Sequence, residues 1–100
     1  MKKPLRICEQ VGAKIYKTNA EFWKNYQDLP REVQRLADEK FELLKRDPRH
    51  PSLNLKKVGV YWVAKVSINY RTLAREENGI LVWFWIGKHD EYMRQIRSAF

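Results

Sequence analysis

The sequence is poor in cysteine and contains no long apolar run. Cys8 is the only cysteine among 100 residues, so no disulfide can form within the chain and a cysteine-based metal site is excluded. With no base near it in the sequence, Cys8 is expected to be inert. No stretch approaches the roughly 18–20 apolar residues that a membrane span requires, and the basic start lacks the apolar segment of a secretory signal. We therefore expect a cytoplasmic protein in a reducing compartment that does not enter a membrane.

Internal repeats and low-complexity tracts are absent as well. The four glycines and four prolines separate periodic segments, as residues that punctuate secondary structure do. Hydrophobic residues make up 44% of the chain and aromatic residues 13%. This is enough apolar material for one core, and the chain is too short for two. We expect a single domain that spans residues 1–100.

Acidic residues are missing from one long segment of a basic chain. The formal net charge is +8 at pH 7, and such a surface attracts polyanions over a Debye length of roughly 8–10 Å. Nucleic acid, an acidic protein and an anionic membrane surface are the partner classes that this charge allows. Between residues 49 and 75 there is no acid, and the cationic residues are Arg49, Lys56, Lys57, Lys65, Arg71 and Arg75. The positive field is expected in this half of the molecule.

Two helices separated by a proline are predicted in the first half. Thr18 and Asn19 are both good N-cap residues for a first helix, whose apolar side chains recur at positions 22, 26 and 29. Pro30 ends that helix and suits the first turn of a second one, which Asp47-Pro48 ends in turn. Residues 14–17 alternate apolar and basic side chains, as a short edge strand does. We expect one strand followed by a helical hairpin.

Three strands and a last helix are predicted in the second half. Residues 49–59 show no clear period and read as a basic loop or extended connector. Strands follow at 60–66, 70–76 and 80–86, with Asn78-Gly79 as a tight hairpin turn and residues 89–100 as a short helix. The order β-α-α-β-β-β-α predicts an α+β fold. In it, the N-terminal helical hairpin packs on one face of a small antiparallel sheet and leaves the other face to a ligand.

Two arginines of the middle strand share one face. Arg71 and Arg75 are four residues apart, so both side chains point the same way at a separation of about 13 Å. This distance is about the length of two phosphate spacings along an extended nucleic-acid strand. The alternative interpretation is that both are ordinary solvated strand residues.

The order of several short motifs resembles the RelE/ParE superfamily. These motifs are Leu29-Pro30 before the long helix, Asp47-Pro48 after it, and the Lys56-Lys57 pair in a basic connector. Tyr70-Arg71 at the start of a strand and the run from Ile86 to Tyr92 after the last strand complete the pattern. The resemblance extends from about Lys14 to Ile96, nearly the whole chain. Each motif alone only marks the end of a helix or strand, and the resemblance rests on the order and spacing of the motifs.

The resemblance implies a function and a set of site residues. Members of the superfamily are toxins of type II toxin–antitoxin pairs, and the RelE-like branch cleaves messenger RNA in the ribosome without a metal or other cofactor. It implies a cognate antitoxin, the ribosome and mRNA as partners. Catalytic roles would fall to Arg71, Lys57, His89 and Tyr92, and RNA-binding roles to Lys56 and Lys57. The acid-free basic segment adds Arg49, Lys65 and Arg75 as RNA-binding candidates. Clustered cations suit such a reaction, because its transition state is a highly charged phosphorane.

Structural interpretations of the same residues remain open. His89 would serve as a helix cap and Tyr92 as an anchor of the last helix to the core. The lysines of the connector would be ordinary surface residues of a loop. His50, between Arg49 and a proline, is expected to be a loop residue. Trp62, Trp83 and Trp85 are expected in the core or on a face of the sheet, with base stacking as the alternative.

Two other functions of the same superfamily remain as alternatives. A ParE-like poison of DNA gyrase binds a protein and needs no nuclease site, and a catalytically silent member binds only its antitoxin or RNA. A shared fold does not separate these functions. The set Lys56, Lys57, Arg71 and His89 favours the endoribonuclease, because a gyrase poison has no need of a phosphate-cleaving site.

Overall fold

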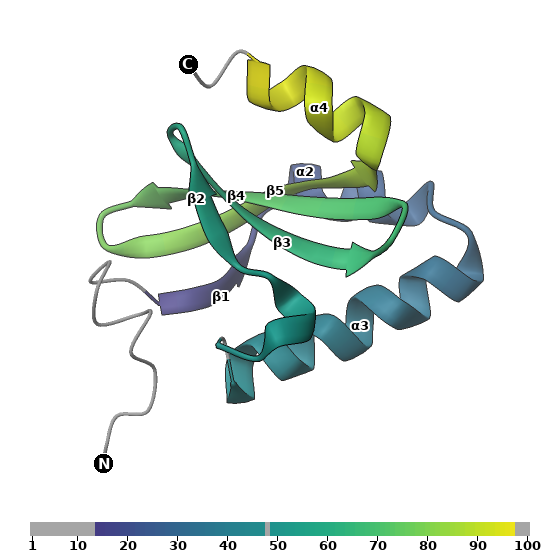
Figure 1. Cartoon of the computed structure of the whole chain (residues 1–100), viewed down its shortest axis with the longest axis horizontal. Coiled ribbons are helices and arrows are strands. Elements are labelled where there is room, and N and C mark those ends of the chain that lie inside the picture. Colours follow the sequence, from purple (N-terminus) through teal and green to yellow (C-terminus); the bar gives the residue numbers. More distant parts are fainter. Residues whose placement is uncertain (1–13, 48, 98–100) are drawn as a thin grey trace.

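The computed structural model describes residues 14–47 and 49–97. The elements are β1 (Lys14–Thr18), α2 (Ala20–Gln27), α3 (Arg31–Arg46), the 3-10 helix η1 (Pro51–Leu53), β2 (Lys56–Val58), β3 (Tyr61–Ser67), β4 (Tyr70–Glu77), β5 (Ile80–Lys88) and α4 (His89–Arg97). Figure 1 shows α3 on one side of the sheet and α4 on the other. The α+β fold with a helical hairpin on a small sheet, which the sequence predicts, is confirmed. Cys8 lies outside the described residues.

The helical hairpin begins and ends where local chemistry requires it. Asn19 caps α2, since its side-chain oxygen accepts a hydrogen bond from the Phe22 N–H at 3.0 Å. Pro30 stands at the N-cap of α3, and α3 ends at Arg46, next to Asp47 at its C-cap. The residue before a proline is disfavoured in a helix, so the stop at Asp47 follows directly from the sequence.

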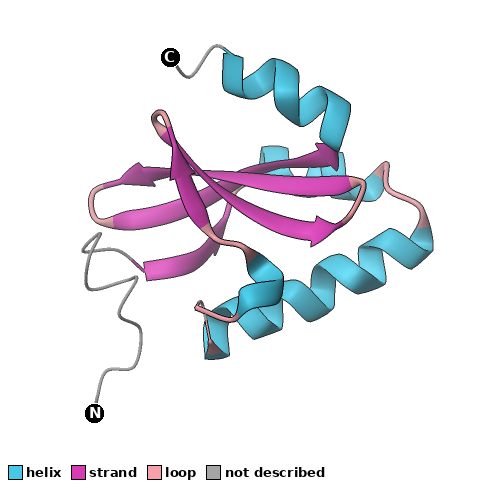
Figure 2. Ribbon diagram, viewed as in Figure 1, coloured by secondary structure: helices cyan, strands magenta, loops and turns pink. Residues whose placement is uncertain are grey.

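The sheet has five strands in the order β1-β5-β4-β3-β2. The pairs β2–β3, β3–β4 and β4–β5 are antiparallel, whereas β1 pairs with β5 in parallel. The sheet is therefore mixed rather than purely antiparallel: no tight hairpin joins β1 to β5, so their pairing is not restricted to the antiparallel direction. The expected connector is also more ordered than a loop: it forms η1 and then the edge strand β2 (Figure 2).

Both faces of the sheet carry a core. The face toward α2 and α3 holds Trp62 and Trp83, and the opposite face holds Trp85, which packs with Tyr92 of α4. The three tryptophans are buried, at 9%, 1% and 8% exposure, as expected. Since α4 covers part of the second face, only the rest of that face is accessible. Within residues 14–47 and 49–97, no helix is both long and apolar enough to cross a bilayer.

Candidate functional site

Strand alternation divides the predicted cations between the two faces of the sheet. Directly paired residues of neighbouring strands place their side chains on the same face. Lys56 pairs with Val63, which belongs to the core under α4, and Lys65 pairs with Arg71. Positions 63 and 65 of β3 share a face, so Lys56, Lys65 and Arg71 all lie on the α4 side of the sheet.

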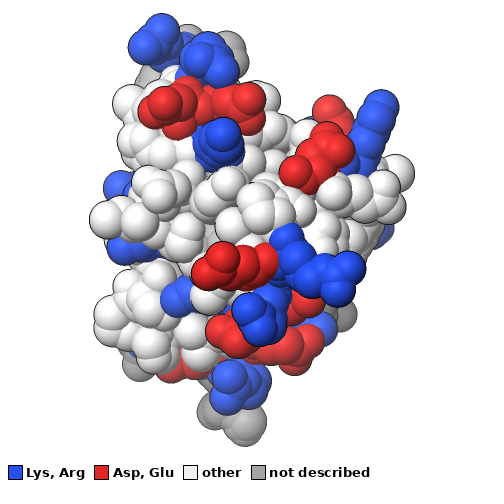
Figure 3. Space-filling model, turned by 90° about the vertical axis from the view of Figure 1, so that its right-hand side faces the viewer, with Lys and Arg blue, Asp and Glu red and all other residues white. Residues whose placement is uncertain are grey.

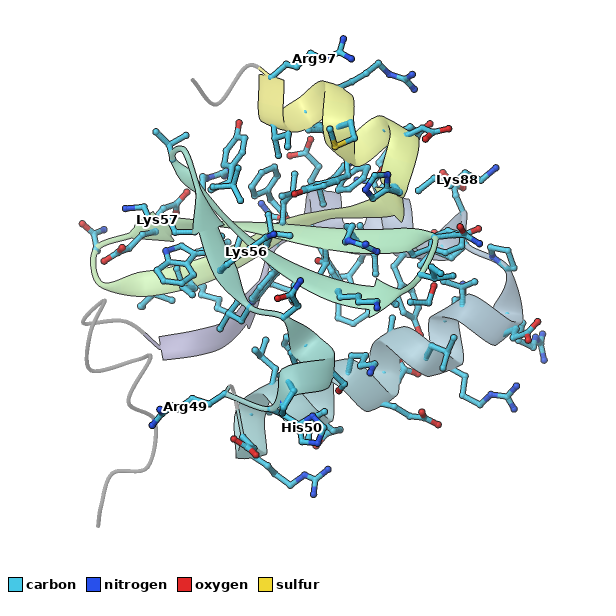
Figure 4. All side chains as sticks on the ribbon, in the orientation of Figure 1. Arg49, His50, Lys56, Lys57, Lys88 and Arg97 are labelled. Atoms are coloured by element: carbon cyan, nitrogen blue, oxygen red, sulfur yellow. The ribbon has the colours of Figure 1, made fainter. Side chains whose placement is uncertain are left out.

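Lys57 lies on the other side. It pairs with Trp62, whose side chain belongs to the core between the sheet and the helical hairpin. Figure 4 shows Lys56 and Lys57 leaving β2 in different directions. The structure therefore does not bring Lys57 together with Arg71. The reason is that the connector becomes a strand here, and successive side chains of a strand point to opposite faces.

Arg49 is also separated from the α4 face. Both Arg49 and His50 lie near the C-terminal end of α3 in Figure 4, below the sheet, whereas α4 lies above it. The His50 Nδ1 accepts a hydrogen bond from the Ser52 N–H at 3.2 Å and caps η1. His50 is thus a structural loop residue, as the sequence suggests, and η1 holds Leu53 in the core at 1% exposure.

Arg71 is half-buried and is held by the turn between β3 and β4. Its Nη1 donates to the carbonyl oxygens of Ser67 at 2.6 Å, Tyr70 at 3.0 Å and Ile68 at 3.3 Å. Arg71 pairs with Gly87 of the neighbouring strand β5, so no side chain of that strand stands opposite it. In the described part of the chain, no carboxylate forms an ion pair with Arg71. Its charge is available to a ligand.

Arg75 has partners of its own. Its Nε forms an ion pair with Glu77 on the same strand, and its guanidinium lies over the Phe84 ring at 4.9 Å from the centroid. Glu77 is two residues further along the strand and therefore lies on the same face. Arg75 shares a face with Arg71, as predicted, but an acid neutralises its charge. The alternation of β4 could have indicated this pair from the sequence.

His89 and Tyr92 form a ring pair at the start of α4. The ring centroids are 5.4 Å apart at an interplanar angle of 54°. Tyr92 is 6% exposed and packs into the core under α4, so it anchors this helix as the structural interpretation expects. His89 is half-buried, and its backbone N–H donates to the Asn69 carbonyl in the β3–β4 turn at 2.8 Å. The turn thus contacts both Arg71 and His89.

A hollow next to His89 contains residues that the sequence analysis missed. Its volume is about 290 Å³, and Asn69, Tyr70, Lys88, His89 and Asp90 line it. A larger groove of about 470 Å³ continues from it past Tyr70 and Lys88 toward the α2–α3 turn. Tyr70 and Lys88 are neighbours of Arg71 and His89 in the sequence, which was the available signal. The pairing of Tyr70 with Lys88 across β4 and β5 brings them together.

The charges at this end of the molecule are mixed. Figure 3 views the side on which α4 begins, and Lys and Arg side chains there are interspersed with Asp and Glu. Glu91 and Arg94 of α4 form one exposed pair, 3.9 Å apart. The positive charge expected in this half of the molecule is therefore interrupted by acids at this end and does not form a continuous basic surface.

The fold is similar to those of several solved toxins. The chain superposes on YafQ from E. coli strain BL21(DE3) with a TM-score of 0.63 at 12% sequence identity, over 80% of this chain and 97% of that one. The match to the RelB–RelE antitoxin–toxin complex from Methanococcus jannaschii has a TM-score of 0.62 at 12% identity, over 79% and 96%. The YoeB/ParE toxin from Agrobacterium tumefaciens gives 0.57 at 16% identity, over 76% and 98%.

Sequence comparison alone finds no such relationship. No protein-family model matches the chain, and a search of curated proteins gives no match. The structural likeness therefore rests on the arrangement of helices and strands, and it confirms the fold that the motif order predicts. The fold is that of the RelE/ParE toxins.

Proposed function

We propose that this chain, whose fold is that of the RelE/ParE toxins, is the toxin of a type II toxin–antitoxin pair and cleaves messenger RNA on the ribosome. One observation carries the proposal: the half-buried Arg71 and the half-buried His89 are held at the same end of the sheet by one turn. An arginine without an acid partner can bind a phosphodiester, and a histidine at the same end of the sheet can exchange a proton with it.

The proposed reaction needs no covalent intermediate on the protein. The ribose 2′-oxygen attacks the adjacent phosphorus, the bond from phosphorus to the 5′-oxygen breaks, and the products are a cyclic phosphate and a 5′-hydroxyl. The 2′-hydroxyl proton leaves to a general base or to water, and a proton is delivered to the departing 5′-oxygen. Arg71 would stabilise the negative charge that grows on the phosphoryl oxygens. His89 would supply the proton, and the Tyr92 ring would hold the imidazole in place.

The remaining cations of the α4 face would bind the RNA backbone. Lys56 is exposed and Lys65 half-buried, and both lie on the same face as Arg71. The structure supports no such role for Lys57 and Arg49, which lie on the opposite side of the sheet, or for Arg75, which is paired with Glu77. The solved RelB–RelE complex pairs a RelE toxin with its antitoxin, and we propose a cognate antitoxin as the protein partner of this chain in the cytoplasm.

Mapping of RNA 5′ ends tests the proposal. The purified protein is mixed with ribosomes that translate a defined message, and cleavage is compared between wild type, Arg71→Ala and Arg35→Ala. Arg35 is an exposed α3 residue, and its substitution removes the same charge far from the site. We expect in-frame cuts by wild type and by the control, and a loss of about 100- to 1000-fold in Arg71→Ala, as for removal of a transition-state donor. If the messages stay intact, or if the protein causes DNA breaks in the presence of gyrase instead of RNA cuts, the assignment is wrong.

A further inference from the structure

All four carbonyl oxygens of the turn between β3 and β4 accept hydrogen bonds from residues of the candidate site. The carbonyls of Ser67, Ile68 and Tyr70 accept hydrogen bonds from the Nη1 of Arg71, at 2.6, 3.3 and 3.0 Å. The fourth carbonyl, that of Asn69, accepts the backbone N–H of His89 at 2.8 Å. Two site residues that are far apart in the sequence are thus attached to the same short piece of main chain.

These bonds decide which edge of the guanidinium remains for a ligand. Nη1 is occupied by the turn, whereas no hydrogen-bond partner of Nε or Nη2 is found in the part of the chain that the structure describes. The N–H groups of Nε and Nη2 are parallel, and their spacing matches two oxygens of one phosphate. The turn therefore leaves the bidentate edge of Arg71 free and fixes the plane in which it lies.

The neighbouring strand presents no acidic side chain opposite Arg71. Arg71 faces Gly87, and a Cβ atom at Gly87 would come within 2.6 Å of the Trp85 ring. The indole of Trp85 thus occupies the place of a side chain at Gly87.

The shape of this turn is not specified by the usual hairpin residues. The β4–β5 turn at the other end of β4 is made by Asn78 and Gly79 with φ of 53° and 78°, the conformation that suits a two-residue hairpin. Neither Ile68 nor Asn69 has a positive φ, and the β3–β4 pairing slips between Lys65 and Ser67. Hydrogen bonds from Arg71 and His89, rather than a glycine, hold the main chain in this shape.

We propose that the β3–β4 turn, residues 67–70, is the positioning element of the site. Its carbonyls present the Nε–Nη2 edge of Arg71 to a phosphate and set the distance between that edge and His89. The inference rests on the proposed RNA cleavage and adds to it: Ser67, Ile68 and Asn69 are positioning residues that act through their main chain. Since a displacement of about 1 Å in a reacting group can cost about 100-fold in rate, the turn should govern kcat more than KM.

Two insertions of one glycine form a matched test. The first lengthens the β3–β4 turn between Ile68 and Asn69, and the second lengthens the β4–β5 turn after Gly79. Both add one residue to a two-residue hairpin turn of the same strand, so similar losses of stability are expected. Urea unfolding checks that both variants fold, and kcat and KM for RNA are measured with translating ribosomes. We expect the first insertion to lower kcat about 100-fold with KM within about threefold, and the second to change kcat less than about threefold.

A chemical rescue gives a second readout that does not depend on the insertions. In Arg71→Ala the turn carbonyls remain, and added guanidinium ion should raise the cleavage rate of this variant at least about tenfold. Methylammonium, which carries the charge without two parallel donors, should restore little. Equal kcat losses from the two insertions, or equal rescue by both ions, would overturn the positioning role while wild-type cleavage continues. An absence of wild-type cleavage would instead overturn the proposed function and this inference with it.

Discussion

Substitution of two neighbouring lysines distinguishes the two faces of the sheet. Lys56 and Lys57 are adjacent, both are exposed, and both belong to the three-residue edge strand β2. They differ in direction, because Lys56 pairs with Val63 on the α4 face and Lys57 with Trp62 on the helical-hairpin face. Lys56→Ala should weaken RNA binding and cleavage, and Lys57→Ala should leave both nearly unchanged.

The expected size follows from the exposure of these side chains. A unit charge at about 4 Å from a phosphate is worth about 1 kcal/mol in water, which is about fivefold in affinity. Loss of one phosphate contact should also reduce the slope of log affinity against log salt by about 0.7, the value for single-stranded nucleic acid. For Lys57→Ala the affinity should change less than about twofold and the slope should not change.

The assay is a salt titration of binding and cleavage for the wild type and the two variants. Each variant removes the same charge from the same strand, so a general effect of net charge would change both variants equally. Exposed substitutions of this kind alter the free energy of unfolding by about 0.5 kcal/mol or less, which urea unfolding can check. A larger loss in Lys57→Ala than in Lys56→Ala would refute the assignment of the α4 face to RNA.

Three further predictions concern stability. Gly87→Ala should lower the free energy of unfolding by about 1–3 kcal/mol in urea titrations, because its new Cβ would lie 2.6 Å from the buried ring of Trp85; an unchanged midpoint would contradict this packing. His50→Ala should cost about 1 kcal/mol, since the Ser52 N–H loses its acceptor, and His50→Asn, which keeps an acceptor, should cost less. Burial and the hydrogen bond to an α3 carboxylate raise the pKa of Tyr26 from 10.0 to about 12. The stability that this neutral phenol contributes is therefore present below pH 10 and lost between pH 10 and about 12, and Tyr26→Phe should show a smaller loss over that range.

The sequence by itself determined the elements and most of their ends. Asn19 as a cap and the Asn78-Gly79 turn act through their own backbone preferences, and the structure has both as predicted. Pro30 lies at the N-cap of α3, one position before the expected first turn. The motif order was sufficient to indicate the fold, which solved structures at 12–16% identity confirm. These features depend only on residues a few positions away, so the local sequence is sufficient to predict them.

Tertiary structure alone decided which site residues meet. The strand β2 has three residues, too few for alternation to be visible in the sequence, so the face of Lys57 became known only through its pairing with Trp62. The parallel pairing of β1 with β5 and the contact of one turn with both Arg71 and His89 join distant segments. Register is set by which side chains are buried across the whole sheet. A single strand's sequence does not contain that information, and the composition of the site depends on it.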